Sequence, residues 1–313
     1  MKSNGKITVS MHPRRIGHAN LTVRDLDRSV KFYNLICGIE ITGIEHAHGI
    51  DAGFLSNGNT HHDVGLVQKA GLPIGLNHFG WEMENELELV QAYRRMEQLG
   101  IEAERLTDQG TSRSVYLKAP DGSSHQFYAD AIKDWRSVYT GGNVVLHGRP
   151  TWAPGDPVPT TDARYQVDPP LRRVDDALAH PAKIGRAVML TTDMERALSF
   201  YTDTAGLEPF YRAPDGSLVC LRGSASSYDL ALVADRERDG LERICFEMPN
   251  EEEVDLAEKA MRKAGQDIVR RQDDERKRGF VIRDPDGIPV ELFRDREVDF
   301  GRLRSNVERL AIA

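Results

Sequence analysis

The segment RIGHANLTVRDLDRSVKFYNLICGIE, residues 15–40, returns 168 positions later as KIGRAVMLTTDMERALSFYTDTAGLE, residues 183–208. An offset of 165 relates GLNHFGWEM, residues 75–83, to GLERICFEM, residues 240–248, and PDGSSHQFYAD to PDGIPVELFRD. Similar segments at a nearly constant offset indicate duplicated structural units. The chain is therefore predicted to contain two homologous halves.

Each half contains a shorter internal repeat. A strand with alternating apolar residues is followed by an amphipathic helix and by shorter strands between Gly and Asp turns. Asp25 and Asp193 precede the first helix of each half, where a side-chain oxygen can cap first-turn amides. The second helices, predicted over 88–100 and 254–265, each end on a glycine that suits a left-handed C-cap. The pattern predicts an α+β fold of four βαβββ modules in two tandem domains.

The length of 313 residues suits about two domains. We predict an amino-terminal domain with a metal site over 1–130, a linker over 131–182, a carboxy-terminal domain over 183–295 and a tail with a short helix over 296–313. The linker contains WAPGDPVPTTD and few periodic apolar positions, so we expect it to pack on the surface.

The net charge is −8 and the Lys and Arg residues are scattered, so the sequence lacks the basic stripe of a nucleic-acid-binding protein. No apolar run approaches the roughly 18 residues of a membrane span, and no signal peptide precedes the first strand. Cys37, Cys220 and Cys245 are isolated, which suits buried side chains in a reducing compartment. We therefore expect a cytoplasmic protein with a small-molecule partner and no membrane association.

Strand alternation predicts which polar side chains share the concave face of the sheet. His18 faces away from the apolar Ala19 and Leu21, and His78 faces away from Asn77 and Phe79. Each histidine is therefore expected to point into the concavity. Tyr116 and Gln126 follow on two later strands of the same half.

A single histidine on a strand is more often a hydrogen-bonded half-buried residue than a metal ligand. His61 and His62, in the segment NTHHDVGLV, could be surface residues of a turn. A lone Tyr116 would be an ordinary sheet aromatic. Only the combination of these residues departs from the ordinary interpretation.

The combination resembles the vicinal oxygen chelate superfamily, and within it the two-domain type I extradiol dioxygenases. In that family two βαβββ modules close into a cup that holds Fe(II), or sometimes Mn(II), on two His and one Glu. By motif, GHANL gives His18 as a metal ligand, LNHFG gives His78, and HQFY places Gln126 where the family has its Glu. THHDVGL supplies His62 as the acid/base residue, and SVYLKAPDG supplies Tyr116.

The resemblance implies extradiol cleavage of a catechol-like aromatic diol by dioxygen, in a homo-oligomer whose metal site lies in the amino-terminal half. His62 would take and return a proton, and Tyr116 would donate a hydrogen bond to a substrate oxygen. Gln126 is neutral and should bind iron more weakly than a carboxylate. Two alternatives remain open: another metal-dependent reaction of the lyase or isomerase type, and small-molecule binding without catalysis.

The carboxy-terminal half has Arg186, Tyr228, Arg243 and Val281 at the matching positions and keeps Glu291. Guanidinium groups cannot ligate a cation and would repel it. We therefore expect no metal in this half. An internal ion-pair cluster of Arg186, Arg243 and Glu291 is favoured over anion binding.

Overall fold

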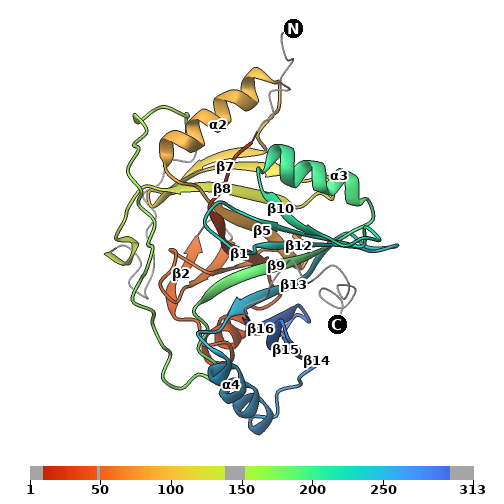
Figure 1. Ribbon diagram of the computed structural model, residues 1–313. Helices are drawn as coiled ribbons and strands as arrows, with labels where there is room; N and C mark the ends of the chain where they lie inside the picture. The colour runs from red at the N-terminus through yellow and green to blue at the C-terminus, as the bar shows by residue number, and fades with distance from the viewer. Residues whose placement is uncertain (1–9, 48–49, 138–151, 297–313) are drawn as a thin grey trace.

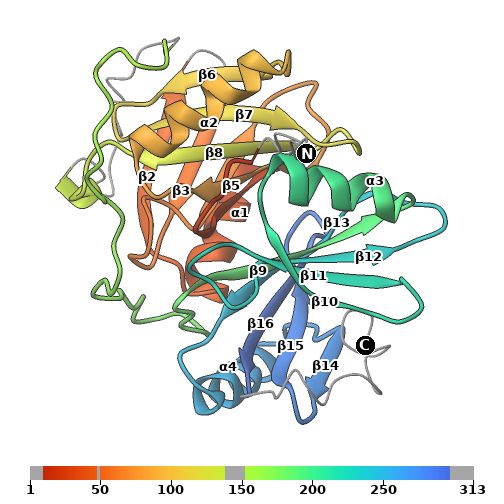
Figure 2. The ribbon, with the colours of Figure 1, turned by 45° about the horizontal axis from the view of Figure 1, so that its top comes forward.

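The computed structural model describes residues 10–47, 50–137 and 152–296. They form two eight-stranded sheets, one in each half of the chain, with few helices on their outer faces (Figure 1 and Figure 2). Each half runs twice through the order strand, helix, three strands. The predicted α+β fold of four βαβββ modules in two tandem domains is confirmed.

The elements of the amino-terminal half are β1 (Arg15–Thr22), α1 (Leu26–Lys31), the π-helical turn η1 (Phe32–Ile36), β2 (Ile41–Ala47), β3 (Ile50–Leu55), β4 (Val64–Gln68), β5 (Gly75–Glu82), α2 (Glu86–Gln98), β6 (Arg105–Asp108), β7 (Ser112–Lys118), β8 (Ser124–Asp130) and η2 (Trp135–Ser137). Those of the carboxy-terminal half are β9 (Lys183–Thr191), α3 (Met194–Ser199), η3 (Phe200–Thr204), β10 (Glu208–Arg212), β11 (Leu218–Arg222), β12 (Leu230–Ala234), β13 (Gly240–Glu247), α4 (Glu251–Lys263), β14 (Arg270–Asp273), β15 (Lys277–Arg283) and β16 (Pro289–Asp295).

The strand order is β2-β3-β4-β1-β5-β8-β7-β6 in one sheet and β10-β11-β12-β9-β13-β16-β15-β14 in the other. The first strand of each module pairs in parallel with the last strand of that module. The two first strands of a half pair antiparallel at the centre of the sheet, β1 with β5 and β9 with β13. Each sheet is therefore two modules joined through their first strands.

The predicted helix caps are present. Asp25 and Asp193 each accept a hydrogen bond from the backbone N–H three residues later, as an N-cap does. The helices α2 and α4 begin two or three residues before their predicted starts and end just ahead of Gly100 and Gly265. Both glycines have positive φ angles, 69° and 73°, which favour glycine as predicted.

Residues 152–182 contain no helix or strand and run beside the amino-terminal half (Figure 2). Trp152 is buried there, and the backbone N–H of Arg172 donates a hydrogen bond to the carbonyl of Asn57. The terminal helix predicted over 296–313 lies, beyond its first residue, outside the residues that the structure describes. Within the described ranges, none of the helices has the length and apolar character needed to cross a membrane.

The two halves are joined by a reciprocal pair of buried aspartates. Asp63 precedes β4 and accepts a hydrogen bond from the backbone N–H of Ile184 on β9, at 3.0 Å. Asp229 precedes β12 and accepts one from the backbone N–H of Ile16 on β1, at 2.9 Å, and another from Gly223, at 2.7 Å. Each half thus fixes the first strand of the other.

Replacing Asp229 by alanine should lower the free energy of unfolding by about 2–5 kcal/mol, because two buried backbone N–H groups lose their acceptor. Urea denaturation followed by circular dichroism measures this change. The exposed Asp267 provides the control, and Asp267→Ala should stay within about 0.5 kcal/mol of the parent protein. Equal effects of the two substitutions would contradict the structural role of Asp229.

A buried histidine, His125 on β8, packs against the other half. Its Nδ1 accepts a hydrogen bond from Trp81 Nε1 at 3.0 Å, and its Nε2 lies 3.3 Å from the Tyr201 hydroxyl and 3.1 Å from Ser123 Oγ. Burial lowers the pKa of His125 from 6.5 to about 4. Protonation of Nδ1 would also place two donors opposite each other at Trp81.

Stability should therefore fall as the pH drops below about 6.5. His125 of the unfolded chain takes up a proton near pH 6.5, whereas the folded chain resists protonation until about pH 4. This single group lowers the free energy of unfolding by about 3 kcal/mol between pH 7 and pH 4. Urea denaturation of the parent protein and His125→Gln over this range tests it: the variant should lose less stability on acidification, and parallel curves would refute the prediction.

Candidate metal centre

Three neighbouring strands bring His18, His78 and Gln126 to one point. His18 Nε2 on β1 and His78 Nε2 on β5 each lie 3.0 Å from Oε1 of Gln126 on β8. The Gln126 side chain is held by its own amide, whose Nε2 donates a hydrogen bond to Ser114 Oγ at 2.7 Å. The amide oxygen is therefore directed at both imidazoles.

Glycines on the sheet make this convergence possible. Gly80 pairs with His18 across one strand boundary and with Gln126 across the other. A Cβ atom at Gly80 would lie 2.1 Å from Cε1 of the His18 ring, so any larger residue would displace the imidazole. At Gly65 a Cβ atom would lie 2.3 Å from the amide nitrogen of Asn20. The floor of the site therefore depends on residues without side chains.

The Nδ1 atom of His78, which points away from Gln126, is held by the preceding residue, Asn77. His78 Nδ1 lies 2.8 Å from Oδ1 of Asn77, although strict alternation predicted that Asn77 would face the other way. That prediction is wrong because the β1–β5 register shifts between Asn20 and Leu21, which leaves Asn77 outside the regular pairing. The Asn77 oxygen requires a proton on Nδ1, so the lone pair of His78 lies on Nε2, toward Gln126.

All three histidines nearest this point are uncharged at neutral pH. Burial, and secondarily the Arg105 cation, lower the pKa of His78 to about 3. Burial and the neighbouring histidines hold the pKa values of His18 and His62 well below 6.5. Neutral imidazole is the form that ligates metals.

The donor set fits a divalent metal. The His78 Nε2 lone pair and the Gln126 oxygen face each other at 3.0 Å, and two acceptors at that distance repel each other unless a cation lies beside them. Ligand atoms at right angles around a metal, with bonds of about 2.1 Å, also lie about 3 Å apart. His18 belongs to a second candidate group with His61 and His62, whose ligating atoms lie within 4.8 Å of one another.

The two residues predicted to assist catalysis lie beside His18 and His78. The ring centroid of His62 is 4.0 Å from that of His18, and neither of its ring nitrogens has a hydrogen-bond partner among the described residues. The Tyr116 ring centroid is 5.4 Å from that of His78. The guanidinium carbon of Arg105 lies 3.7 Å from the Tyr116 ring centroid. The structure thus gathers all five predicted site residues, each no more than 6% exposed.

Several neighbours of the site were missed. His61 is 1% exposed and His62 is 5% exposed, so the interpretation of this pair as surface residues is wrong. His61 Nδ1 lies 3.5 Å from Asp130, and the Tyr128 ring stacks on His18 at a centroid distance of 5.2 Å. The only sequence signal for these neighbours was the pair of adjacent histidines before an apolar strand.

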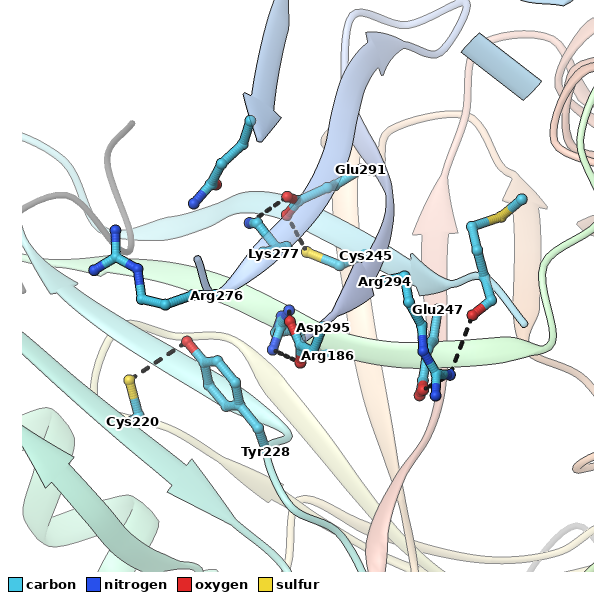
Figure 3. A network of polar contacts seen from close by, with 12 residues as sticks. Arg186, Cys220, Tyr228, Cys245, Glu247, Arg276, Lys277, Glu291, Arg294 and Asp295 are labelled. Atoms are coloured by element: carbon cyan, nitrogen blue, oxygen red, sulfur yellow. Dashed lines mark hydrogen bonds and ion pairs between the residues drawn. The ribbon is translucent and has the colours of Figure 1, made fainter. Parts of the chain in front are cut away.

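The matching position in the carboxy-terminal half holds ion pairs (Figure 3). Arg243 Nε donates to Glu291 at 2.8 Å. Lys277, which the sequence analysis did not single out, also bonds to Glu291 (Figure 3). The predicted cluster of Arg186, Arg243 and Glu291 is thus partly wrong, because Arg186 pairs through two nitrogens with Asp295, at 2.9 and 2.6 Å.

Comparison with known proteins gives one family. The family model described as Glyoxalase/Bleomycin resistance protein/Dioxygenase superfamily matches residues 15–127 and 183–292. A curated relative, the Catechol-2,3-dioxygenase of Bacillus subtilis (strain 168), is 26% identical over 286 residues, which cover 86% of this chain and 93% of the relative.

Solved structures share the fold. The 2,3-dioxygenase LapB of Pseudomonas sp. KL28 has a TM-score of 0.65 at 18% identity, with 93% of this chain and 96% of that chain covered. The Mn(II)-bound glyoxalase of Novosphingobium aromaticivorans also has a TM-score of 0.65, at 17% identity and with 93% and 85% covered. The homoprotocatechuate 2,3-dioxygenase of Brevibacterium fuscum, in complex with 3,4-dihydroxyphenylacetate, has a TM-score of 0.65 at 15% identity, with 94% and 85% covered.

Proposed function

Because the chain belongs to the Glyoxalase/Bleomycin resistance protein/Dioxygenase superfamily, we propose that it is an extradiol dioxygenase that cleaves the ring of a catechol-like aromatic diol. The site would lie in an amino-terminal domain over 1–130. The observation that carries the proposal is the convergence of His18, His78 and Gln126 at contacts of 3.0 Å. The name of the Bacillus subtilis relative supports the reaction class.

His18, His78 and Gln126 would hold the metal, Fe(II) in the first instance and Mn(II) as the alternative. Bound there, the ion would supply open positions for both diol oxygens and for dioxygen, and would lower the pKa of the diol hydroxyls. Asn77 keeps the lone pair of His78 directed into the site through its contact at Nδ1.

His62 would accept the proton that the diol loses on binding. It is neutral, and both of its ring nitrogens lack partners among the described residues, so one nitrogen can take the proton without breaking an existing hydrogen bond. Tyr116 would donate a hydrogen bond to a substrate oxygen, because burial raises the pKa of its hydroxyl and keeps the proton in place.

A second reaction class is a metal-dependent lyase or isomerase that does not consume oxygen. Gln126 favours it, because a neutral ligand compensates less of the metal charge than the carboxylate of a 2-His-1-carboxylate iron site. The fold similarity to the Mn(II)-bound glyoxalase is compatible with this class.

An oxygen electrode separates the two classes. Protein loaded anaerobically with Fe(II) is mixed with a panel of catechols, and oxygen uptake is followed together with loss of the catechol spectrum. We expect one dioxygen consumed per diol cleaved. Binding of catechols to fully loaded protein without oxygen uptake would refute the dioxygenase proposal.

A further inference from the structure

The carboxy-terminal half contains a cavity of about 880 Å³ at the position that corresponds to the amino-terminal metal site. Its wall includes Arg186 and Arg243, which match His18 and His78 at offsets of 168 and 165. Small-molecule sites typically have volumes of about 300–1,000 Å³. The carboxy-terminal half therefore has arginines where the other half has its two histidines, and it contains a cavity of ligand size.

The cavity wall is cationic and largely buried. The basic side chains that line it and are at most 6% exposed are Arg186, Arg243, Arg276 and Lys277. Glu291, paired with Arg243 and Lys277, is 2% exposed. Arg243 also bonds to Glu242, and Arg276 bonds to Asp274. The Asp295 side chain that pairs with Arg186 is 44% exposed. Cations removed from water are stabilised by an anion at short range, and solvent weakens the contribution of an exposed carboxylate.

Arg186 is held rigidly at the cavity wall. Its guanidinium carbon lies 4.3 Å from the centre of the Tyr228 ring and 4.0 Å from that of Phe293. Figure 3 shows Arg186 with Asp295 on one side and Tyr228 nearby. A guanidinium fixed in this way presents a planar set of donors suited to a carboxylate.

The surroundings of Lys277 also favour binding of an anion. Burial, Arg186 and Arg243 lower its pKa, and Glu291 offsets only part of this effect. A second anion in the cavity would favour the charged form of this amine.

Four aromatic side chains also form part of the wall. Phe210, Tyr211, Tyr228 and Phe293 line the cavity, and the rings of Phe210 and Tyr228 meet edge to face at 5.4 Å. The Tyr211 hydroxyl is enclosed and has no hydrogen-bond partner among the described residues. Such rings bind a flat apolar body, and a hydroxyl beside them can bind a polar substituent.

We propose that the carboxy-terminal cavity is a metal-free binding site for a small aromatic carboxylate, whose carboxylate meets Arg186 and Lys277 and whose ring packs among the aromatic side chains. The sequence alone favoured a purely structural ion-pair cluster over anion binding. The inference goes beyond the proposed dioxygenase activity and does not depend on it.

Isothermal titration calorimetry of the full chain with three probes tests the chemistry. Benzoate should bind with one site per chain, and benzyl alcohol and inorganic phosphate should each bind at least about tenfold more weakly, because each lacks one half of the recognised group. Phosphate binding as tight as benzoate binding would overturn the assignment to an aromatic carboxylate.

Two substitutions with opposite expected effects on benzoate affinity test where the ligand binds. Asp295→Asn removes the exposed carboxylate that competes for Arg186, and it should tighten benzoate binding by about threefold or more. Arg186→Gln should weaken binding by about tenfold or more. The control Arg238→Gln, at a side chain that is 71% exposed and outside the cavity wall, should leave the affinity unchanged.

The gain expected of Asp295→Asn keeps the test decisive even if Arg186→Gln does not fold, because a purely structural ion pair predicts no tighter binding when it is broken. Unchanged or weaker benzoate binding by Asp295→Asn would overturn the proposal.

Discussion

Replacement of His78 by alanine is expected to remove the bound divalent metal and the ring-cleaving activity together, each by more than about 100-fold. In the proposed site His78 would supply one of three donor atoms, and its Nε2 lies 3.0 Å from Oε1 of Gln126, the neighbouring proposed ligand. Loss of a residue that merely orients a ligand already costs about 10–100-fold in metal affinity, so loss of the ligand itself should cost more.

The measurement pairs metal analysis by inductively coupled plasma mass spectrometry with oxygen uptake on the same preparation. His46→Ala is the matched control, because His46 lies on β2 with a side chain that is 59% exposed and contacts Asp51 rather than the site. The metal content and oxygen uptake of Asn77→Ala should lie between those of His78→Ala and His46→Ala, since this substitution removes only the acceptor at His78 Nδ1. A His78→Ala protein with full metal loading and normal ring cleavage would exclude His78 as a ligand.

Replacement of Gln126 by glutamate is expected to tighten metal binding by about tenfold or more. The substitution keeps the length of the side chain and the position of one oxygen but adds the negative charge of a 2-His-1-carboxylate site. Residue 126, His18 and His78 are all almost fully buried, so water screens that charge only weakly. The charge should therefore attract a divalent ion strongly.

Competition with a chromophoric chelator measures the affinities of the parent protein, Gln126→Glu and Gln126→Ala. The alanine variant should bind metal more weakly than the parent, because it lacks both the oxygen and the charge. If glutamate weakened metal binding relative to glutamine, the side chain at this position would not be a ligand.

The fold and the shared face of His18 and His78 were predictable from sequence because both follow from repeats and strand alternation. The offsets of 168 and 165 indicate two halves, the shorter repeat within each half indicates two modules, and two-residue alternation places His18 and His78 on one face. Asn77 escaped this argument, because a register shift interrupts the alternation at that point.

The same register shift recurs in the other half and has different consequences there. The β9–β13 pairing shifts between Leu241 and Arg243, and Glu242, 165 residues after Asn77, bonds to Arg243 as Asn77 bonds to His78. One backbone irregularity therefore supports an imidazole in one half and a guanidinium in the other. Neither contact could be predicted from alternation alone.

Contacts between distant strands carried no recognisable signal. Arg105 lies over Tyr116 because β6 pairs with β7, and Ser114 reaches Gln126 because β7 pairs with β8. In the carboxy-terminal half, the sequence predicted an ion-pair role for Arg186, but the choice of Asp295 as its partner depends on where β16 ends.

The central claim is that two imidazoles and one amide oxygen hold a metal, and the orientation of the Gln126 amide decides it. With its oxygen toward the histidines and the His78 proton on Nδ1, a cation would stabilise the facing lone pairs of His78 and Gln126, whereas a reversed amide would donate its NH2 group to both Nε2 atoms. The most direct test is metal content per chain in protein purified without chelators and reloaded with Fe(II). Our account predicts one divalent ion per folded chain in the parent protein and none in His18→Ala, whereas a parent protein that binds no metal at saturating Fe(II) would contradict it.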